Sequence, residues 1–226
     1  MLKAVIFDFD GLIIDTELPE FETWRETFQA FGGTLNLEKW LPMVGSGTST
    51  APFDIYAYLE EQAGRTLDKE AIRAERQQRY LEKIATQPLL PGVEKLIYEA
   101  HQQGIAVAVA SSSTRSWVEG HLKERGLLNY FHSITTADEV EFAKPRPDIY
   151  LKALQKLNIQ PHEAIALEDS LHGMRAAKAA GIYCIVVPNT LTRHFDFSEA
   201  DRRISSIAEL SLANLLQDFA DADVSR

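Results

Sequence analysis

The sequence predicts an α/β fold: a doubly wound, mostly parallel sheet with a Rossmann-like core and an inserted α-helical cap domain. At the start of the chain and from residue 91 onward, short apolar runs alternate with helical patterns, as expected for parallel strands covered on both faces. Between these two parts, residues 16–87 show helical patterns and no convincing strand. We therefore expect an α/β core of residues 1–15 and 88–226 and a helical cap of residues 16–87.

The predicted core elements follow in order along the chain. Strands are expected at 4–7, 105–110, 132–136, 164–168 and 182–188. The segment between Pro91 and Gly104 has apolar residues at helical spacing, with a typical first-turn proline and a terminal glycine. Residues 146–158 repeat this spacing, so helices connect the strands.

The predicted cap contains aromatic residues at helical spacing. They are Phe21, Trp24, Phe28 and Phe31. A second helical pattern covers residues 68–85. A stripe of this kind is typical of a buried helix face, so we expect these aromatics to form the cap's own core rather than a ligand cage.

Composition limits the possible partners and compartments. The net charge is −10, with 33 acidic and 23 basic residues, which disfavours nucleic acid and anionic membranes as bulk partners. The single cysteine, Cys184, lies in an apolar run and excludes a disulfide within the chain. No apolar run reaches the ~18 residues of a membrane helix. We expect a cytoplasmic monomer that acts on a small molecule.

Polar and charged residues follow the predicted strands at four places. They are Asp8 and Asp10, Ser111 to Ser113, Lys144 after a loop, and Glu168 with Asp169. In an open parallel sheet the ligand crevice lies beyond the carboxyl ends of the strands. All four groups can therefore line one crevice.

The carboxylates in this crevice require a cation, because buried unpaired charges are costly. Oxygen ligands without a cluster of His or Cys suit a hard ion, and Mg²⁺ is the usual one. Each group also has a simpler interpretation when taken alone. These are a turn at Asp8 and Asp10, a helix cap at the serines, a second helix cap at Asp169 or Ser170, and a solvated Lys144. Their joint position at strand ends favours a site.

Two aspartates of this kind can divide the work of phosphoryl transfer. One carboxylate attacks phosphorus to form an aspartyl-phosphate, and the other gives a proton to the leaving oxygen and later takes one from water. The developing charge on the phosphoryl oxygens can be stabilised by Mg²⁺, Lys144, the Ser111 hydroxyl and the Ser112 amide.

The segments DFDGLIIDT, VAVASSS, AKPRPDIY and LEDSLHGMRAAKAAG, in this order, resemble the four motifs of the haloacid dehalogenase-like hydrolase superfamily. The similarity is greatest to its phosphatase and β-phosphoglucomutase-like branch and extends to about Pro188. It implies a helical cap that closes over the active site.

The resemblance also implies a role for each motif residue. Asp8 would be the nucleophile and a metal ligand, and Asp10 the acid/base, binding Mg²⁺ through its backbone carbonyl. Ser111 and Lys144 would hold the phosphate. The metal site would be completed by Asp169 with Glu168 beside it. A true dehalogenase needs no proton donor at Asp10, so the resemblance favours a phosphatase.

A sugar phosphomutase is the alternative enzyme. Mutases that resemble this chain carry a histidine five residues after the position of Asp15, where Glu20 stands here. They also carry a basic residue in a cap loop, whereas residues 44–50 contain no Arg or Lys, and Arg115 could partly compensate. We therefore expect a Mg²⁺-dependent phosphatase acting on a small phosphorylated metabolite such as a sugar phosphate.

Substrate specificity is expected in the cap and beside the serines. The candidate contacts are Glu20, Gly45, Thr48 and Arg115, with the aromatics Trp24, Trp40 and Phe53. A non-enzymatic regulatory domain that accepts phosphate on an aspartate is the alternative from another class. Such domains are shorter and lack a helical insert after the first strand, which disfavours this alternative.

Overall fold

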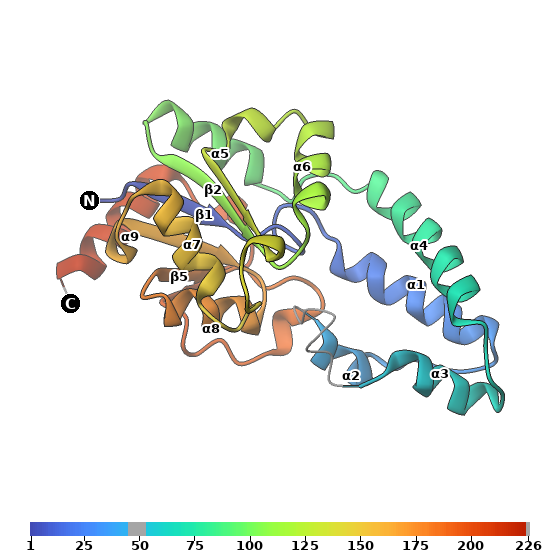
Figure 1. Ribbon diagram of the computed structural model, residues 1–226. Coiled ribbons are helices and arrows are strands. Elements are labelled where there is room, and N and C mark those ends of the chain that lie inside the picture. Colours follow the sequence, from blue (N-terminus) through green and yellow to red (C-terminus); the bar gives the residue numbers. More distant parts are fainter. Residues whose placement is uncertain (45–52, 225–226) are drawn as a thin grey trace.

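The computed structural model describes residues 1–44 and 53–224 and contains a parallel sheet with helices on both faces (Figure 1). The strands are β1 (Ala4–Phe7), β2 (Ala106–Ser111), β3 (Ser133–Thr136), β4 (Ala164–Glu168), β5 (Tyr183–Val186) and β6 (Arg202–Arg203). Their order across the sheet is β3-β2-β1-β4-β5-β6, with every neighbouring pair parallel. The predicted fold class is confirmed. The sixth strand is an addition, because two arginines leave no strand pattern in the sequence.

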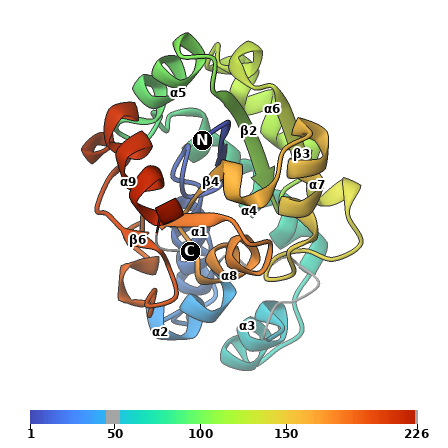
Figure 2. The same cartoon turned by 90° about the vertical axis from the view of Figure 1, so that its left-hand side faces the viewer.

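The helices of the core are α5 (Val93–Gln102), α6 (Arg115–Glu124), α7 (Asp148–Leu157), α8 (Leu171–Ala179) and α9 (Leu212–Val224). Helices α5, α6 and α9 pack on one face of the sheet, and α7 and α8 pack on the other, as the end-on view shows (Figure 2). The pleat separates the side chains accordingly. In β1, Val5 and Phe7 face α5 and α6, whereas Ala4 and Ile6 face α7 and α8.

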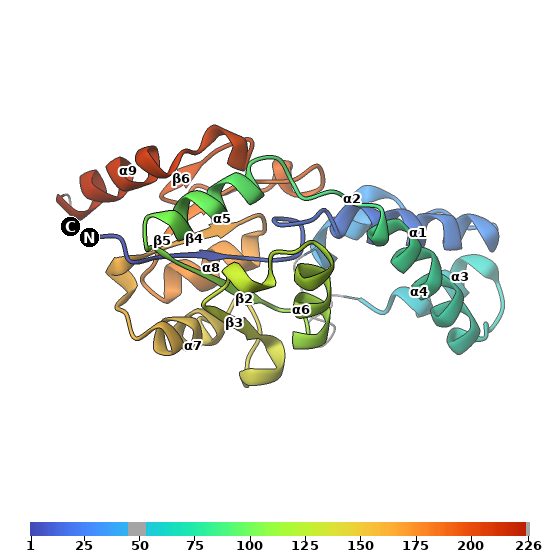
Figure 3. The ribbon, with the colours of Figure 1, turned by 90° about the horizontal axis from the view of Figure 1, so that it is seen from above.

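The inserted segment forms α1 (Glu17–Ala30), α2 (Leu37–Trp40), α3 (Ile55–Ala63) and α4 (Lys69–Ala85). These helices extend beyond the sheet on the side of α6, with α1 and α4 side by side (Figure 3). The predicted aromatic stripe forms their own core, where Phe21, Trp24 and Phe28 are buried. The expectation that these aromatics are structural is confirmed.

Two chain segments connect the cap helices to the core, and they are hydrogen-bonded to each other. The amide of Leu90 donates to the carbonyl of Ile13 at 2.9 Å, and Ile14 and Leu89 form an antiparallel bridge. The pairing fixes where the cap helices leave the core.

Two further sequence expectations concern the rest of the fold. Cys184 is buried in β5, as predicted. None of the helices that the structure describes is long and apolar enough to cross a membrane.

Candidate active site

The residues that follow β1, β2 and β4 meet at one edge of the sheet, around a cavity of about 410 Å³. The cavity is lined by Asp8, Asp10, Thr16, Glu17, Glu20, Tyr80, Ser112, Ser113, Thr114, Trp117, Lys144, Asp169 and Ser170. β1 lies between β2 and β4, so the order in which strands are added to the sheet reverses here and leaves a crevice beyond the strand ends. Most of the predicted site residues are therefore brought together.

Lys144 is the cation at the centre of this cluster. Its side chain is 3% exposed, and its Nζ lies 2.8 Å from Oδ1 of Asp8 and 2.7 Å from Oε1 of Glu168. Tyr150 donates a second hydrogen bond to the same oxygen of Glu168. Burial opposes the charge on Lys144, but Asp8 and Glu168 raise its pKa overall, so it stays an ammonium. The alternative of a solvated surface lysine is wrong.

The carboxyl groups around Lys144 are more numerous than one ammonium can neutralise. Burial, reinforced by the charge of Glu168, raises the pKa of Asp8 to about 7 despite the nearby Lys144. Burial and the charge of Asp8 also raise the pKa of Asp169 well above its ordinary value. A further positive charge would let these groups ionise together.

The carboxylate geometry fits a hard metal ion. Asp8, Glu168 and Asp169 each offer an oxygen, and the three atoms lie within 4.8 Å of one another. The second oxygen of Glu168, Oε2, is buried and has no hydrogen-bond partner in the described structure. An oxygen-only donor set of this kind suits a divalent cation such as Mg²⁺. The side chain of Asp10 is not part of this triad.

Asp169 is held in place from two sides. Nδ2 of Asn189 donates to its Oδ2 at 2.7 Å. Gly11 has φ +76° and lies so close to this carboxylate that a Cβ there would overlap it. The glycine of the first motif is therefore required both by its backbone conformation and by the approach of Asp169.

Asp10 points to the other side of the cavity. Oγ of Ser113 donates to its Oδ2 at 2.6 Å, and Nε1 of Trp117 donates to its Oδ1 at 2.9 Å. Burial raises the pKa of Asp10, while these donors lower it. Sequence reasoning missed Trp117, and the only available signal was its position in the helix that follows the serines.

The serines at and after the end of β2, Ser111 to Ser113, do not cap the next helix. Ser111 is fully buried, does not line the cavity and accepts a hydrogen bond from the amide of Ser113 at 3.0 Å. Ser112 lines the cavity, and its buried hydroxyl has no hydrogen-bond partner. Thr114, not one of the serines, caps α6. The helix-cap alternative for the serines is therefore wrong.

The predicted specificity residues have different outcomes. Glu20 lines the cavity from the cap helix α1. Arg115 does not: its guanidinium pairs with Glu119 at 2.6 Å and with Glu139 at 2.5 Å. Because both carboxylates neutralise it away from the cavity, its expected role in specificity is not supported.

Other predicted contacts also lie elsewhere. Trp24 and Trp40 are buried in the cap core, Phe53 packs against it, and none of the three lines the cavity. This corrects the expectation that these aromatics contact substrate. Gly45 and Thr48 lie outside the described residues.

Sequence reasoning also missed Glu17 and Tyr80, two further residues that line the cavity. Burial and the charges of Asp10 and Glu20 raise the pKa of Glu17 to about 8. Tyr80, from α4, stacks on Trp117 of the core with ring centroids 5.8 Å apart. This stack joins the cap helices to the residue that holds Asp10.

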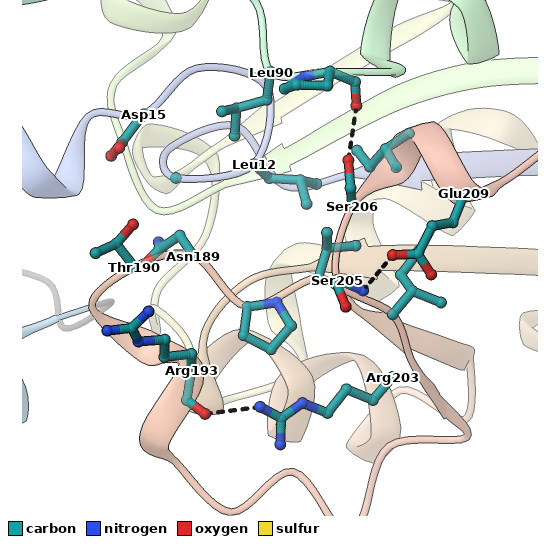
Figure 4. A pocket seen from close by; sticks show the side chains of 16 residues that line it. Leu12, Asp15, Leu90, Asn189, Thr190, Arg193, Arg203, Ser205, Ser206 and Glu209 are labelled. Carbon is teal, nitrogen blue, oxygen red and sulfur yellow. Dashed lines mark hydrogen bonds between the residues drawn. The ribbon is translucent and has the colours of Figure 1, made fainter.

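A second, larger cavity of about 810 Å³ lies beside the cap connections (Figure 4). It is bordered by Leu12 and Leu90, which come from the two connecting segments, and by Arg193 and Arg203. The guanidinium of Arg203 donates a hydrogen bond to the backbone carbonyl of Arg193. Asp15 of the first motif borders this cavity, but Asp8, Asp10 and Lys144 do not. We therefore place the reaction in the smaller cavity.

Comparisons with known proteins identify the family to which this chain is similar. A family model described as haloacid dehalogenase-like hydrolase matches residues 5–187. The chain is 44% identical over 216 residues to "Putative phosphatase YhcW" of Bacillus subtilis (strain 168), covering 96% of this chain and 97% of that protein. It is 31% identical over 221 residues to hexitol phosphatase B of Escherichia coli (strain K12), covering 95% and 97%.

A solved structure shows the same similarity. The crystal structure of CbbY from Rhodobacter sphaeroides, in a mutant form bound to xylulose-(1,5)bisphosphate, superposes with a TM-score of 0.77 at 35% identity. The similarity covers 95% of this chain and 99% of that one. Together with the family match over most of the chain, these similarities show that the protein belongs to the haloacid dehalogenase-like hydrolase family.

Proposed function

We propose that the protein hydrolyses a small sugar-like phosphate monoester in two steps, through an aspartyl-phosphate on Asp8, with Mg²⁺ bound beside it. The chain is a phosphoric monoester hydrolase, in line with its family and its named phosphatase relatives. The observation that carries the two-step mechanism is the placement of two aspartates with different partners, Asp8 on Lys144 and Asp10 on Trp117 and Ser113.

In the first step a carboxylate oxygen of Asp8 attacks phosphorus, and the bond from phosphorus to the ester oxygen breaks. Asp10 gives its proton to that leaving oxygen, which departs as an alcohol. In the second step water attacks the same phosphorus, Asp10 takes back a proton, and Asp8 is released with inorganic phosphate. Each aspartate therefore ends the cycle as it began.

The phosphoryl group carries negative charge throughout and needs donors around it. Lys144 contributes its ammonium, and Ser112 contributes a buried hydroxyl that has no other partner in the described structure. Mg²⁺, held by Asp8 and Asp169 with Glu168 beside them, would supply further positive charge at the phosphoryl oxygens.

Hydrolysis is favoured over a mutase reaction by the cap side of the cavity. A mutase must hold a second phosphate, yet the described cap residues that line the cavity are two acids, Glu17 and Glu20, and the neutral Tyr80. The hexitol phosphatase relative supports a polyhydroxylated substrate.

Phosphate release and isomerisation should be measured on the same preparation. We expect Mg²⁺-dependent release of phosphate from 4-nitrophenyl phosphate and from a hexitol phosphate, and loss of that release in EDTA. Conversion of β-glucose 1-phosphate to glucose 6-phosphate without net release would instead identify a mutase. Stable phosphorylation without turnover would identify the regulatory alternative.

Trp117→Phe tests the role of Asp10 as proton donor. Because the substitution removes the Nε1 donor that orients Asp10, we expect kcat/KM for an alkyl phosphate to fall about 10-fold. 4-Nitrophenyl phosphate, whose leaving group departs without a proton, should change little. Equal losses on both substrates would show that Trp117 is only structural.

A further inference from the structure

The charge of the active cavity is strongly asymmetric. Among the described residues that line it, Lys144 is the only Lys or Arg, and it already contacts Asp8 and Glu168. On the cap side the wall carries the carboxylate of Glu20 and the carboxyl group of Glu17. Among the described lining residues, positive charge is therefore present only at the end of the cavity where Asp8 acts.

The nearest cap cation is already neutralised. Arg76 lies one helical turn before Tyr80 on α4, and its Nη1 is 2.9 Å from Oε1 of Glu20. Its guanidinium also lies over the ring of Trp24, 4.6 Å from the ring centroid. The side chain is 10% exposed and does not line the cavity. Glu20 therefore lies on the cavity wall, and its carboxylate is paired with Arg76, which is not among the lining residues.

We propose that this cavity selects substrates with one phosphate and an uncharged, hydroxylated remainder, and that the Glu20–Arg76 pair excludes a second anionic group. The inference rests on the proposed function and assigns its substrate class. Hydroxyl groups can donate to Glu17 and Glu20 and can pair with Tyr80. A second phosphate or a carboxylate would instead lie beside the carboxylate of Glu20, with no free cation among the described lining residues, which costs both desolvation and repulsion.

The selectivity is a property of this cap wall rather than of the family's fold. CbbY, with a similar fold, is seen in complex with a bisphosphate. For this chain to bind a bisphosphate, a cation would have to be free to contact the second phosphate. Arg76 is the candidate, but it is paired with Glu20. Removing the charge of Glu20 should therefore change specificity rather than only weaken binding.

Binding can be measured without turnover by calorimetry in Mg²⁺, using protein that carries Asp8→Asn in every sample. The probes are fructose 6-phosphate and fructose 1,6-bisphosphate, which differ by one phosphate. We expect the monophosphate to bind at least ~10-fold more tightly. Adding Glu20→Gln should reduce this ratio by about 10-fold, because the bisphosphate gains the guanidinium of Arg76.

A matched control comes from the same pair of helices. Glu22 on α1 pairs with Lys83 on α4 at 3.1 Å but does not line the cavity. Glu22→Gln therefore removes a similar ion pair and should leave the binding ratio unchanged. Adding Arg76→Gln to Glu20→Gln should abolish the gain for the bisphosphate.

Several outcomes would overturn the inference. They are a binding ratio near one, monophosphate binding too weak to detect, and equal effects of Glu20→Gln and Glu22→Gln. Phosphate release by the unsubstituted enzyme is followed in parallel. If it is absent while the binding ratios are as expected, the specificity stands and the proposed hydrolysis is wrong.

Discussion

Asp8→Asn is expected to lower kcat for phosphate release by ~10⁴-fold or more, because an amide oxygen cannot replace the attacking carboxylate. The same change removes a carboxylate that contacts Lys144 and that would also bind the proposed metal ion. Activity is checked by phosphate release in Mg²⁺, and the intermediate by acid-quenched labelling with a ³²P substrate. Label should remain on the unsubstituted protein and be absent from the variant.

The stability of Asp8→Asn separates lost chemistry from lost folding. Burial and Glu168 raise the pKa of Asp8 to about 7 without metal. A carboxyl group with a raised pKa stabilises the folded state at low pH, and that contribution is lost as the pH rises toward 7. Asparagine carries no charge, so above pH 7 the metal-free variant should melt at or above the temperature of the unsubstituted protein.

A matched control for Asp8→Asn is Asp54→Asn, which changes the exposed cap of α3. Asparagine caps helices about as well as aspartate, so activity and melting temperature should both be retained. Substantial turnover by Asp8→Asn would exclude Asp8 as the nucleophile.

Gly173→Ala is expected to destabilise the protein by about 2–4 kcal/mol and to remove most of its activity. A Cβ at Gly173, on α8, would overlap the carboxylate of Glu168. That carboxylate cannot move freely, because it is fully buried and bound by Lys144 and Tyr150. Displacing it would leave the ammonium of Lys144 incompletely paired in the interior. The measurements are urea unfolding and phosphate release.

Gly120→Ala is the matched control, because the same substitution is expected to stabilise the protein there. Gly120 lies within α6, is exposed, and has no atom within 4 Å of an added Cβ. Alanine favours a helix over glycine, so this variant should be stabilised by about 0.5–1 kcal/mol. If Gly173→Ala also stabilises the protein, the conclusion that the carboxylate of Glu168 is held in a fixed position is wrong.

The central acids and the lysine of the site could be predicted from the sequence. Asp8, Glu168 and Asp169 end or directly follow strands, and parallel strands bring their carboxyl ends to one edge of a sheet. Lys144 differs from these residues because it follows a loop rather than a strand, but it lies at the same edge of the sheet. The sequence pattern and the parallel topology were sufficient to predict these residues, because the course of the backbone places them at the strand ends.

The tertiary structure alone decided which side chains complete the site. Arg115 and Trp117 are two residues apart on α6, and charge made Arg115 the candidate from the sequence. Two residues correspond to about 200° around a helix, so only one of them can face Asp10. Packing of α6 on the sheet directs Trp117 to Asp10 and leaves Arg115 with two glutamates.

The same holds for the cap. The sequence predicted helical segments that correspond to residues 17–30 and 69–85, and a buried aromatic face on the first of them. It did not determine that Glu20 would meet Arg76, or that Tyr80 would stack on Trp117. These contacts join residues far apart in the chain, and they depend on how each helix is rotated about its axis. That rotation is set by the packing of the whole cap and core rather than by any local pattern.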